Sequence, residues 1–319
     1  PMVAAVSNAG GLGILATGPL DAEGTRQAIR QIRGLTDKPF GANATLLFPG
    51  AAENARVLLE EQVPVINFSL GKGDWIVREA HAYGGKVIAT VVNARHAKRA
   101  QDYGADGVVA TGHEAAAHGE EITSFLLIPS LADLLEIPVI AAGGIADGRG
   151  LAAALALGAE GAAMGSRFMT TKESPLHDRY KKLSLEKGVD DTLYSARFDG
   201  LPCRVMKTHA AKRAIRRGLD LPAAFVNSRQ IAAQLHLPYL KLFLGVLASG
   251  WKNARQLAFM ANGFAAIRRA TEEGDVEKGV LPVGQSMGLI RDEPTVKEVV
   301  ERIVAEAEQI LRRLSAQSS

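Results

Sequence analysis

Apolar segments alternate with amphipathic segments through the first half of the chain, and this alternation limits the possible folds most strongly. The predicted strands are apolar runs at residues 12–16, 40–46, 63–69, 86–92, 107–111, 138–142 and 161–165. Helical periodicity is found between them at residues 21–33, 51–61, 74–82, 94–103 and 150–157. Because the apolar runs are continuous, we expect strands that are buried on both faces, as in a parallel sheet covered by helices.

Strands joined by helices form βαβ units, which build either a closed eight-stranded barrel or an open doubly wound sheet. Polar residues and glycines gather at the ends of the predicted strands, which favours the α/β fold of a TIM-type (β/α)8 barrel. The sequence starts within a predicted helix at residues 2–6, so that seven strands are visible. We therefore expect the first strand of the barrel to be missing from the chain as given.

The sequence pattern changes after Phe168. Residues 175–270 show helical periodicity without convincing strands, which predicts a helical insertion or cap on the barrel. The predicted domains are barrel strands two to eight with a phosphate site over residues 1–174 and the helical cap over residues 175–270. Residues 271–319 are expected to return to the barrel and to end in an amphipathic helix that starts after Pro294.

Composition excludes several classes of protein. The 37 basic and 34 acidic residues give a net charge of +3, which is too small to predict a nucleic-acid partner. The one cysteine, Cys203, excludes an internal disulfide and is compatible with a reducing compartment. No apolar run reaches the roughly 18 residues that a membrane helix needs. We expect a soluble cytoplasmic protein without a membrane partner, in which apolar positions near residues 240–260 form core or the contacts of a homodimer.

Two glycine turns follow the last two predicted strands. Gly143 and Gly144 follow one strand, and Gly165, Ser166 and Arg167 follow the next. Glycines allow backbone N–H groups to approach an anion closely, and barrel enzymes commonly hold a phosphate at the loops after strands seven and eight. The turns therefore predict a phosphate site, although such glycines also occur in turns that bind nothing.

Five segments carry a resemblance to a known family: NAGGLGIL, LTDKPFGANATLL, GHEAAAHGEE, IPVIAAGGIADGRGLAAALALGAEGAAMGSRF and EEGDVEKGVLPVGQSMGLIRDEP. Together they resemble the nitronate monooxygenases, formerly called 2-nitropropane dioxygenases. This family includes flavin-dependent enoyl-acyl-carrier-protein reductases and some NADH:quinone reductases. The resemblance covers nearly the whole chain and implies FMN, bound non-covalently with its phosphate at the two glycine turns.

The resemblance also assigns residues around the flavin ring. Asn43 matches an asparagine that contacts the flavin, and Gln285 lies in a segment that lines its edge. Thr90 stands where some members place a lysine against the flavin, so a positive charge is expected to be absent there. His118 matches the active-site histidine, although the usual Ala-Gly-Gly before it is replaced by alanines at residues 115–117.

Two histidines, His113 and His118, follow the predicted strand at residues 107–111. An imidazole can take or give a proton at carbon near neutral pH, and small neighbours leave room for a substrate. We predict that His118 is catalytic and that His113 is structural; a purely structural His118 bonded to Glu120 or Glu121 is the alternative. No metal ligand set is predicted.

Three functions remain open from the sequence. The first is FMN-dependent oxidation of alkyl nitronates with O₂ to a carbonyl compound and nitrite. The second is reduction of enoyl thioesters or quinones with NAD(P)H as the electron donor, for which the basic run at residues 207–217 would dock an acidic carrier or a phosphorylated acyl tail. The third is a binding barrel without turnover.

Overall fold

A computed structural model describes residues 1–116, 118–234, 236, 238–248 and 250–317. The chain divides into two compact units. The first comprises residues 1–113, 120–174 and 293–319, and the second comprises residues 114–119 and 175–292. Residues 271–292, which the sequence analysis assigned to a return segment, therefore lie in the second unit.

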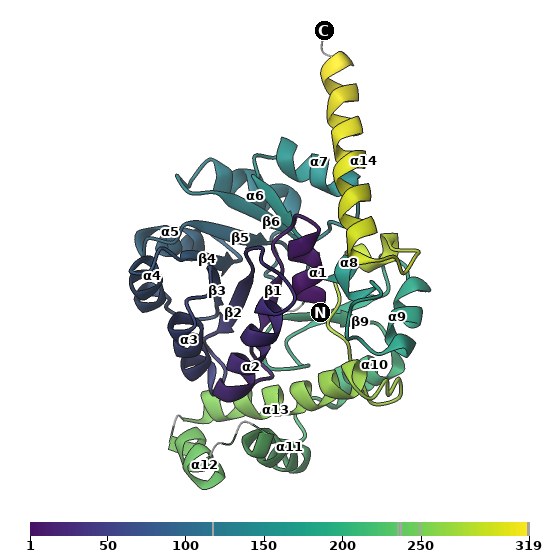
Figure 1. Ribbon diagram of the computed structural model, residues 1–319. Coiled ribbons are helices and arrows are strands. Elements are labelled where there is room, and N and C mark those ends of the chain that lie inside the picture. Colours follow the sequence, from purple (N-terminus) through teal and green to yellow (C-terminus); the bar gives the residue numbers. More distant parts are fainter. Residues whose placement is uncertain (117, 235, 237, 249, 318–319) are drawn as a thin grey trace. The chain divides into compact units, whose positions relative to one another are not determined.

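The first unit contains a parallel sheet of seven strands within its described residues, and each strand pairs with the next along the chain. This is the sheet of a TIM-type barrel, and Figure 1 shows helices α3, α4 and α5 on the outer side of its strands. The strands are β1 (Ile14–Ala16), β2 (Gly41–Thr45), β3 (Val65–Ser69), β4 (Lys86–Val91), β5 (Gly107–Thr111), β6 (Val139–Ala142) and β7 (Gly161–Ala163). All seven predicted strands are confirmed, with ends trimmed by up to two residues in most cases.

The helices of the first unit are α1 (Met2–Asn8), α2 (Ala22–Arg33), α3 (Ala51–Glu60), α4 (Asp74–His81), α5 (Ala94–Asp102), α6 (Ser124–Ala132), α7 (Gly148–Ala156), α8 (Ser166–Met169) and α14 (Val296–Gln317). Helices α2 to α7 connect the strands, α1 precedes the first strand, and α8 and α14 follow the last one. Side-chain caps start several of them: Asp21 accepts from Gly24 N at 2.8 Å, and Asn93 accepts from His96 N at 2.9 Å. Such caps satisfy backbone donors that the first helical turn leaves open, and each stabilises the helix by about 1 kcal/mol.

The core of the first unit lies between the sheet and its helices. Ile29, Leu58 and Ile66 are fully buried there, and Leu127 is 1% exposed. Burial of each such side chain contributes about 1.5–3 kcal/mol to folding. The helices are thus fixed to the sheet by apolar packing, which leaves the carboxyl ends of the strands as the place where polar side chains can gather.

The second unit is mainly helical but also contains a β-hairpin. Its elements are α9 (Asp178–Leu185), β8 (Thr192–Ser195), β9 (Cys203–Met206), α10 (His209–Arg217), α11 (Leu221–Gln234), α12 (Tyr239–Ala248), α13 (Trp251–Thr271) and the 3-10 helix η1 (Gln285–Leu289). The expectation of no strand between residues 175 and 270 is wrong, because β8 and β9 pair antiparallel. Each strand has four residues and β9 is buried along its whole length, Arg204 included, so no alternation of polar and apolar residues reveals it. Among the described helices, none is both long and apolar enough to span a bilayer.

The contact between α7 and α14 requires a glycine. Gly148 N donates to Glu306 Oε2 at 2.7 Å, and a Cβ at Gly148 would lie 2.5 Å from the Cβ of Glu306 and 2.6 Å from Ala307 N. Backbone atoms of α14 cannot move aside without shifting the helix. The C-terminal helix therefore depends on the missing side chain at this position.

We predict that Gly148→Ala lowers the free energy of unfolding by about 1–3 kcal/mol, the usual cost of overpacking. Gly161→Ala is the matched control, because a Cβ there meets no atom within 4 Å. Chemical denaturation of both variants measures the difference. Equal stability of the two variants would contradict the proposed packing.

Candidate active site

Polar side chains lie side by side in the middle of β2 and β3 and near the carboxyl end of β4. Asn43 and Asn67 lie opposite each other in the parallel register. Thr90 donates its hydroxyl to Asn67 Oδ1 at 3.1 Å, and Asn67 Nδ2 donates to Ile88 O at 3.3 Å. Asn67 was not found from the sequence, because a single asparagine within an apolar run looks like any other buried strand residue. Asn43, Asn67 and Thr90 thus form a row of polar side chains across three neighbouring strands of the first unit.

Asn43 has an unsatisfied acceptor in this row. Its Nδ2 donates to Thr45 Oγ1 at 3.3 Å, but its buried Oδ1 receives no hydrogen bond from any described residue. A buried acceptor left without a donor costs about 1–3 kcal/mol, so native proteins rarely keep one unless something else donates to it. The carbonyl oxygen of Asn43 is therefore suited to an N–H group of a bound molecule.

The two glycine turns lie after β6 and β7 in the first unit. Gly143 and Gly144 have φ values of 106° and 76°, a region that strains residues with a side chain. Gly165 has an ordinary negative φ, and a Cβ there would meet no atom within 4 Å. Ser166 begins α8 directly after Gly165, whereas α7 begins at Gly148 rather than directly at the first turn. No atom of the described chain therefore fills the position that a side chain at Gly165 would take.

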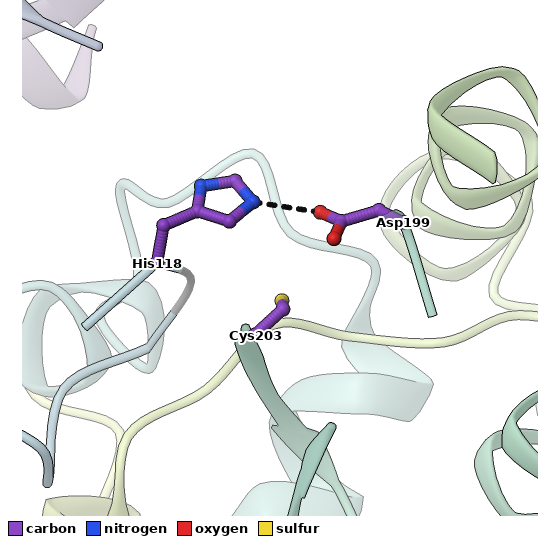
Figure 2. Close-up of side chains that lie close together, drawn as sticks. All are labelled: His118, Asp199 and Cys203. Carbon is purple, nitrogen blue, oxygen red and sulfur yellow. Dashed lines mark hydrogen bonds and ion pairs between the residues drawn. The ribbon is translucent and has the colours of Figure 1, made fainter. Parts of the chain in front are cut away.

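His118 lies in the second unit and pairs with an acidic residue. Its Nε2 lies 2.8 Å from Asp199 Oδ2, and Figure 2 shows the imidazole ring turned toward that carboxylate. The His118 side chain is 21% exposed, whereas that of Asp199 is 7% exposed. The expected alternative partners, Glu120 and Glu121, are not the residues that hold it. The exposed fraction leaves part of the imidazole open to a substrate.

Contacts from distant parts of the chain hold the His118 loop, residues 114–119. The hydroxyl of Tyr194 donates to Gly119 O at 2.7 Å, and the backbone N–H of Gln285 donates to Glu114 O at 2.9 Å. Ala117, one of the alanines that replace the family's glycines, lies outside the described residues. The loop follows β5 in sequence yet packs with the second unit, because its hydrogen-bond partners belong to that unit.

Arg204 supports Tyr194 from β9. The guanidinium carbon of Arg204 lies 5.4 Å from the centroid of the Tyr194 ring, and its Nη1 donates to Thr192 Oγ1 at 2.8 Å. Burial lowers the pKa of the Arg204 guanidinium, while Tyr194 and Glu114 act in the opposite direction. This buried cation was missed from the sequence, since it lies in the stretch assigned to helices.

Asp199 is held by the turn that contains it. The backbone N–H of Leu201 donates to Asp199 Oδ1 at 3.2 Å, and the intervening Gly200 has a φ of +89°. Asp199 was not singled out from the sequence, because it is 81 residues away from His118 and its neighbours gave no motif. The only available signal was Asp-Gly-Leu-Pro, which is typical of a turn.

Cys203 completes a group of three potential metal ligands. One ligand atom each of His118, Asp199 and Cys203 lies within 4.8 Å of the others, and Figure 2 shows the thiol beside the pair. Burial raises the pKa of the Cys203 thiol, and the carboxylate of Asp199 raises it further, so a metal would have to displace the thiol proton in order to bind. At neutral pH these residues therefore form a hydrogen-bonded pair beside a neutral thiol.

The predicted site residues divide between the two units. Asn43, Thr90, Gly143, Gly144, Gly165 and Ser166 lie in the first unit, and His118 and Gln285 lie in the second. Gln285 begins η1, and its Nε2 lies 3.5 Å from Val189 O. His113 lies in the first unit, where its Nδ1 is 2.9 Å from Glu120 O. Their roles in cofactor binding and catalysis remain predictions.

Known proteins similar to this chain are oxidoreductases. A CoA-ester enzyme of Rhodococcus jostii, (3aS,4S,5R,7aS)-5-hydroxy-7a-methyl-1-oxo-octahydro-1H-indene-4-carboxyl-CoA dehydrogenase, is 38% identical over 99% of this chain and 90% of its own length. A nitronate monooxygenase of Paraburkholderia phytofirmans is 32% identical over 64% of this chain and 69% of its own length. The structure of FabK from Thermotoga maritima is similar with a TM-score of 0.82 and 37% identity, over 99% of this chain and 91% of FabK.

The family model described as nitronate monooxygenase matches residues 1–57 and 49–306. This match spans both the strand ends of the first unit and the His118 loop with its partners in the second. The members of the family are flavin-dependent enzymes. The chain therefore belongs to the nitronate monooxygenase family and is a flavin-type oxidoreductase.

Proposed function

We propose that this protein is an FMN-dependent oxidoreductase of acyl-CoA thioesters, in which His118 moves a proton at the carbon next to the thioester carbonyl. The observation that carries the proposal is the extent of the likeness to the CoA-ester dehydrogenase, which matches 99% of the chain. The nitronate monooxygenase of Paraburkholderia phytofirmans matches 64%. The likeness to the CoA-ester enzyme thus extends over more of this chain than the likeness to that nitronate monooxygenase does.

The residues of the first unit suit a flavin. Asn43 offers a buried oxygen that receives no hydrogen bond from the part of the chain that the structure describes. An oxidised flavin ring carries an N–H group from which such an oxygen can accept. Gly165 leaves open space where any larger residue would place a Cβ. Gly143, Gly144, Gly165 and Ser166 would hold the phosphate, and Asn43 and Thr90 would face the ring. When bound, FMN accepts a hydride from a substrate or returns one to it.

His118 supplies the proton transfer that accompanies the hydride. A carbonyl or nitro group acidifies the neighbouring C–H bond, so the same imidazole suits either substrate class. In dehydrogenation of a thioester, His118 would take the proton from the α-carbon, and a bound flavin would supply the hydride acceptor for the β-carbon. In the reverse direction, His118 returns the proton to the α-carbon. An imidazole performs both steps near neutral pH and typically contributes 10²–10⁴-fold to the rate.

A basic helix in the second unit suits the anionic part of coenzyme A. Four residues of α10, Lys212, Arg213, Arg216 and Arg217, are exposed. Arg217 also pairs with Asp220 at 2.8 Å, which neutralises part of this charge. Coenzyme A carries several phosphate groups, and an exposed cluster of cations attracts such a ligand.

Oxidation of alkyl nitronates is the second candidate function. The family model and several relatives that are named nitronate monooxygenases favour it. Oxygen uptake with nitrite release from a nitroalkane would support it. Turnover of a panel of acyl-CoA thioesters without nitrite would support the thioester function, and rapid anaerobic bleaching of the flavin by NADH would identify the electron donor of a reductase.

Gly165→Ala is predicted to weaken FMN binding at least about tenfold, or about 1.4 kcal/mol. The added Cβ would occupy the space that the phosphate needs, while the negative φ of Gly165 and its lack of neighbours leave the fold unstrained. Fluorescence titration of the flavin-free protein with FMN measures the change. Gly161→Ala, at a glycine with equal open space on the preceding strand, is the control and should bind FMN like the wild type. Equal affinity of the two variants would exclude a phosphate at Gly165.

His118→Ala is predicted to reduce turnover of the thioester by about 10²–10⁴-fold, because the reaction loses its general acid or base. The flavin spectrum and the melting temperature should stay unchanged. His113→Ala, which changes a neighbouring histidine bonded to Glu120 O, serves as the control and should retain activity. Steady-state kinetics with the same substrate decide between them, and full activity of His118→Ala would remove His118 from its proposed role.

A further inference from the structure

We infer that Asp199 is a positioning residue, which holds His118 in the tautomer with its proton on Nε2 and so leaves Nδ1 as the nitrogen that exchanges a proton with the substrate. This inference rests on the proposed function, in which His118 moves that proton. It is carried by the 2.8 Å contact between His118 Nε2 and Asp199 Oδ2.

The chemistry of the two groups fixes the direction of this hydrogen bond. An ionised carboxylate can only accept hydrogen bonds, and a neutral imidazole carries a proton on one of its two nitrogens. If Nε2 donates to Asp199, then Nδ1 must be the unprotonated nitrogen that can accept a proton. Figure 2 shows that Nδ1 lies on the side of the ring away from Asp199.

Neighbouring residues hold the carboxylate of Asp199 in place. Leu201 N donates to the second oxygen, Asp199 Oδ1, at 3.2 Å. On α13, Gly263 faces the same residue so closely that a Cβ on Gly263 would lie 2.8 Å from the Cβ of Asp199. The side chain of Asp199 is therefore confined between its own turn and α13, and it cannot easily swing away from His118.

The neighbouring thiol cannot take the place of Asp199. Cys203 lies beside the pair, and burial raises the pKa of its thiol, so it remains protonated. A neutral thiol is a weak donor and a weak acceptor, and it gives the imidazole no strong preference for either tautomer. The choice of tautomer thus depends on the carboxylate.

A second histidine pair in the chain provides an internal reference. His81 Nε2 lies 2.8 Å from Asp106 Oδ2, the same two atom types at the same distance, but the His81 side chain is 41% exposed. His81 is the last residue of α4, and Asp106 accepts from Val87 N and directly precedes β5, so this pair lies at the amino ends of β4 and β5. Asp106→Asn removes such a carboxylate without touching the proposed active site.

The substitution Asp199→Asn keeps the size of the side chain but removes its charge, and with it the group that selects the tautomer of His118. An asparagine can still accept from Leu201 N, which preserves the turn. It can also turn its NH₂ group toward Nε2, and the proton of His118 then moves to Nδ1. We expect kcat to fall on the order of 10²-fold or more with little change in KM, as for a carboxylate that orients a catalytic histidine. Asp199→Glu keeps the acceptor and should restore part of kcat.

The decisive measurement is the tautomer of His118 in the flavin-loaded protein. With ¹⁵N-labelled histidine, long-range ¹H–¹⁵N spectra distinguish a protonated Nε2 from a protonated Nδ1, and the signals of His118 are those missing from His118→Gln. We expect Nε2–H in the wild type and in Asp106→Asn, and loss of this preference in Asp199→Asn. The same spectra report on His81 as the reference.

Two results would overturn the inference: a wild-type His118 protonated on Nδ1, or an Asp199→Asn variant that keeps both the Nε2–H tautomer and the wild-type kcat. Failure of the proposed function has a different signature. In that case His118→Ala would turn over thioesters like the wild type, whereas the tautomer spectra would still show whether Asp199 selects Nε2–H.

Discussion

Parallel pairing of consecutive strands is the constraint on which the site in the first unit depends. In such a sheet every strand runs in the same direction, so the register of pairing places equivalent residues of β2, β3 and β4 next to one another. Asn43, Asn67 and Thr90 are brought together in this way, although more than 20 residues separate Asn43 from Asn67 and Asn67 from Thr90 in sequence. Apolar packing of the helices fixes the strands, and the polar row costs stability that this packing offsets.

In the second unit, hydrogen bonds fix the position of the His118 imidazole and of the loop that carries it. A loop of small residues has little packing of its own, so the six residues 114–119 depend on hydrogen bonds from elsewhere in the chain. Tyr194, Gln285 and Asp199 supply three such bonds, from the hairpin, from η1 and from the turn between β8 and β9. Each contributes about 1 kcal/mol, and together they tie Glu114, His118 and Gly119 to the second unit.

The sequence predicts the sheet well and the histidine's surroundings poorly, for a physical reason. Strands such as β5 are continuous apolar runs, and turns such as Gly143-Gly144 need glycine for their backbone angles, so each leaves a local signal. Asp199 leaves none, because its importance comes from a contact with a residue 81 positions away. The hairpin β8–β9 was missed since its four-residue strands are too short to show a period.

Relatives of this chain include a CoA-ester dehydrogenase and nitronate monooxygenases, so one fold serves two classes of substrate. A flavin, a proton-transferring histidine and an acidified C–H bond serve nitroalkanes and thioesters alike, so these parts do not distinguish the two substrates. What distinguishes them must lie in the residues that surround the histidine and receive the rest of the substrate.

In this chain the residues near the histidine include a buried carboxylate, a neutral thiol and a buried guanidinium, at Asp199, Cys203 and Arg204. The likeness to the CoA-ester dehydrogenase covers 99% of the whole chain and therefore includes these three residues. If the second unit selects the substrate, comparison of the turnover of thioesters and nitronates tests that unit more directly than it tests the barrel.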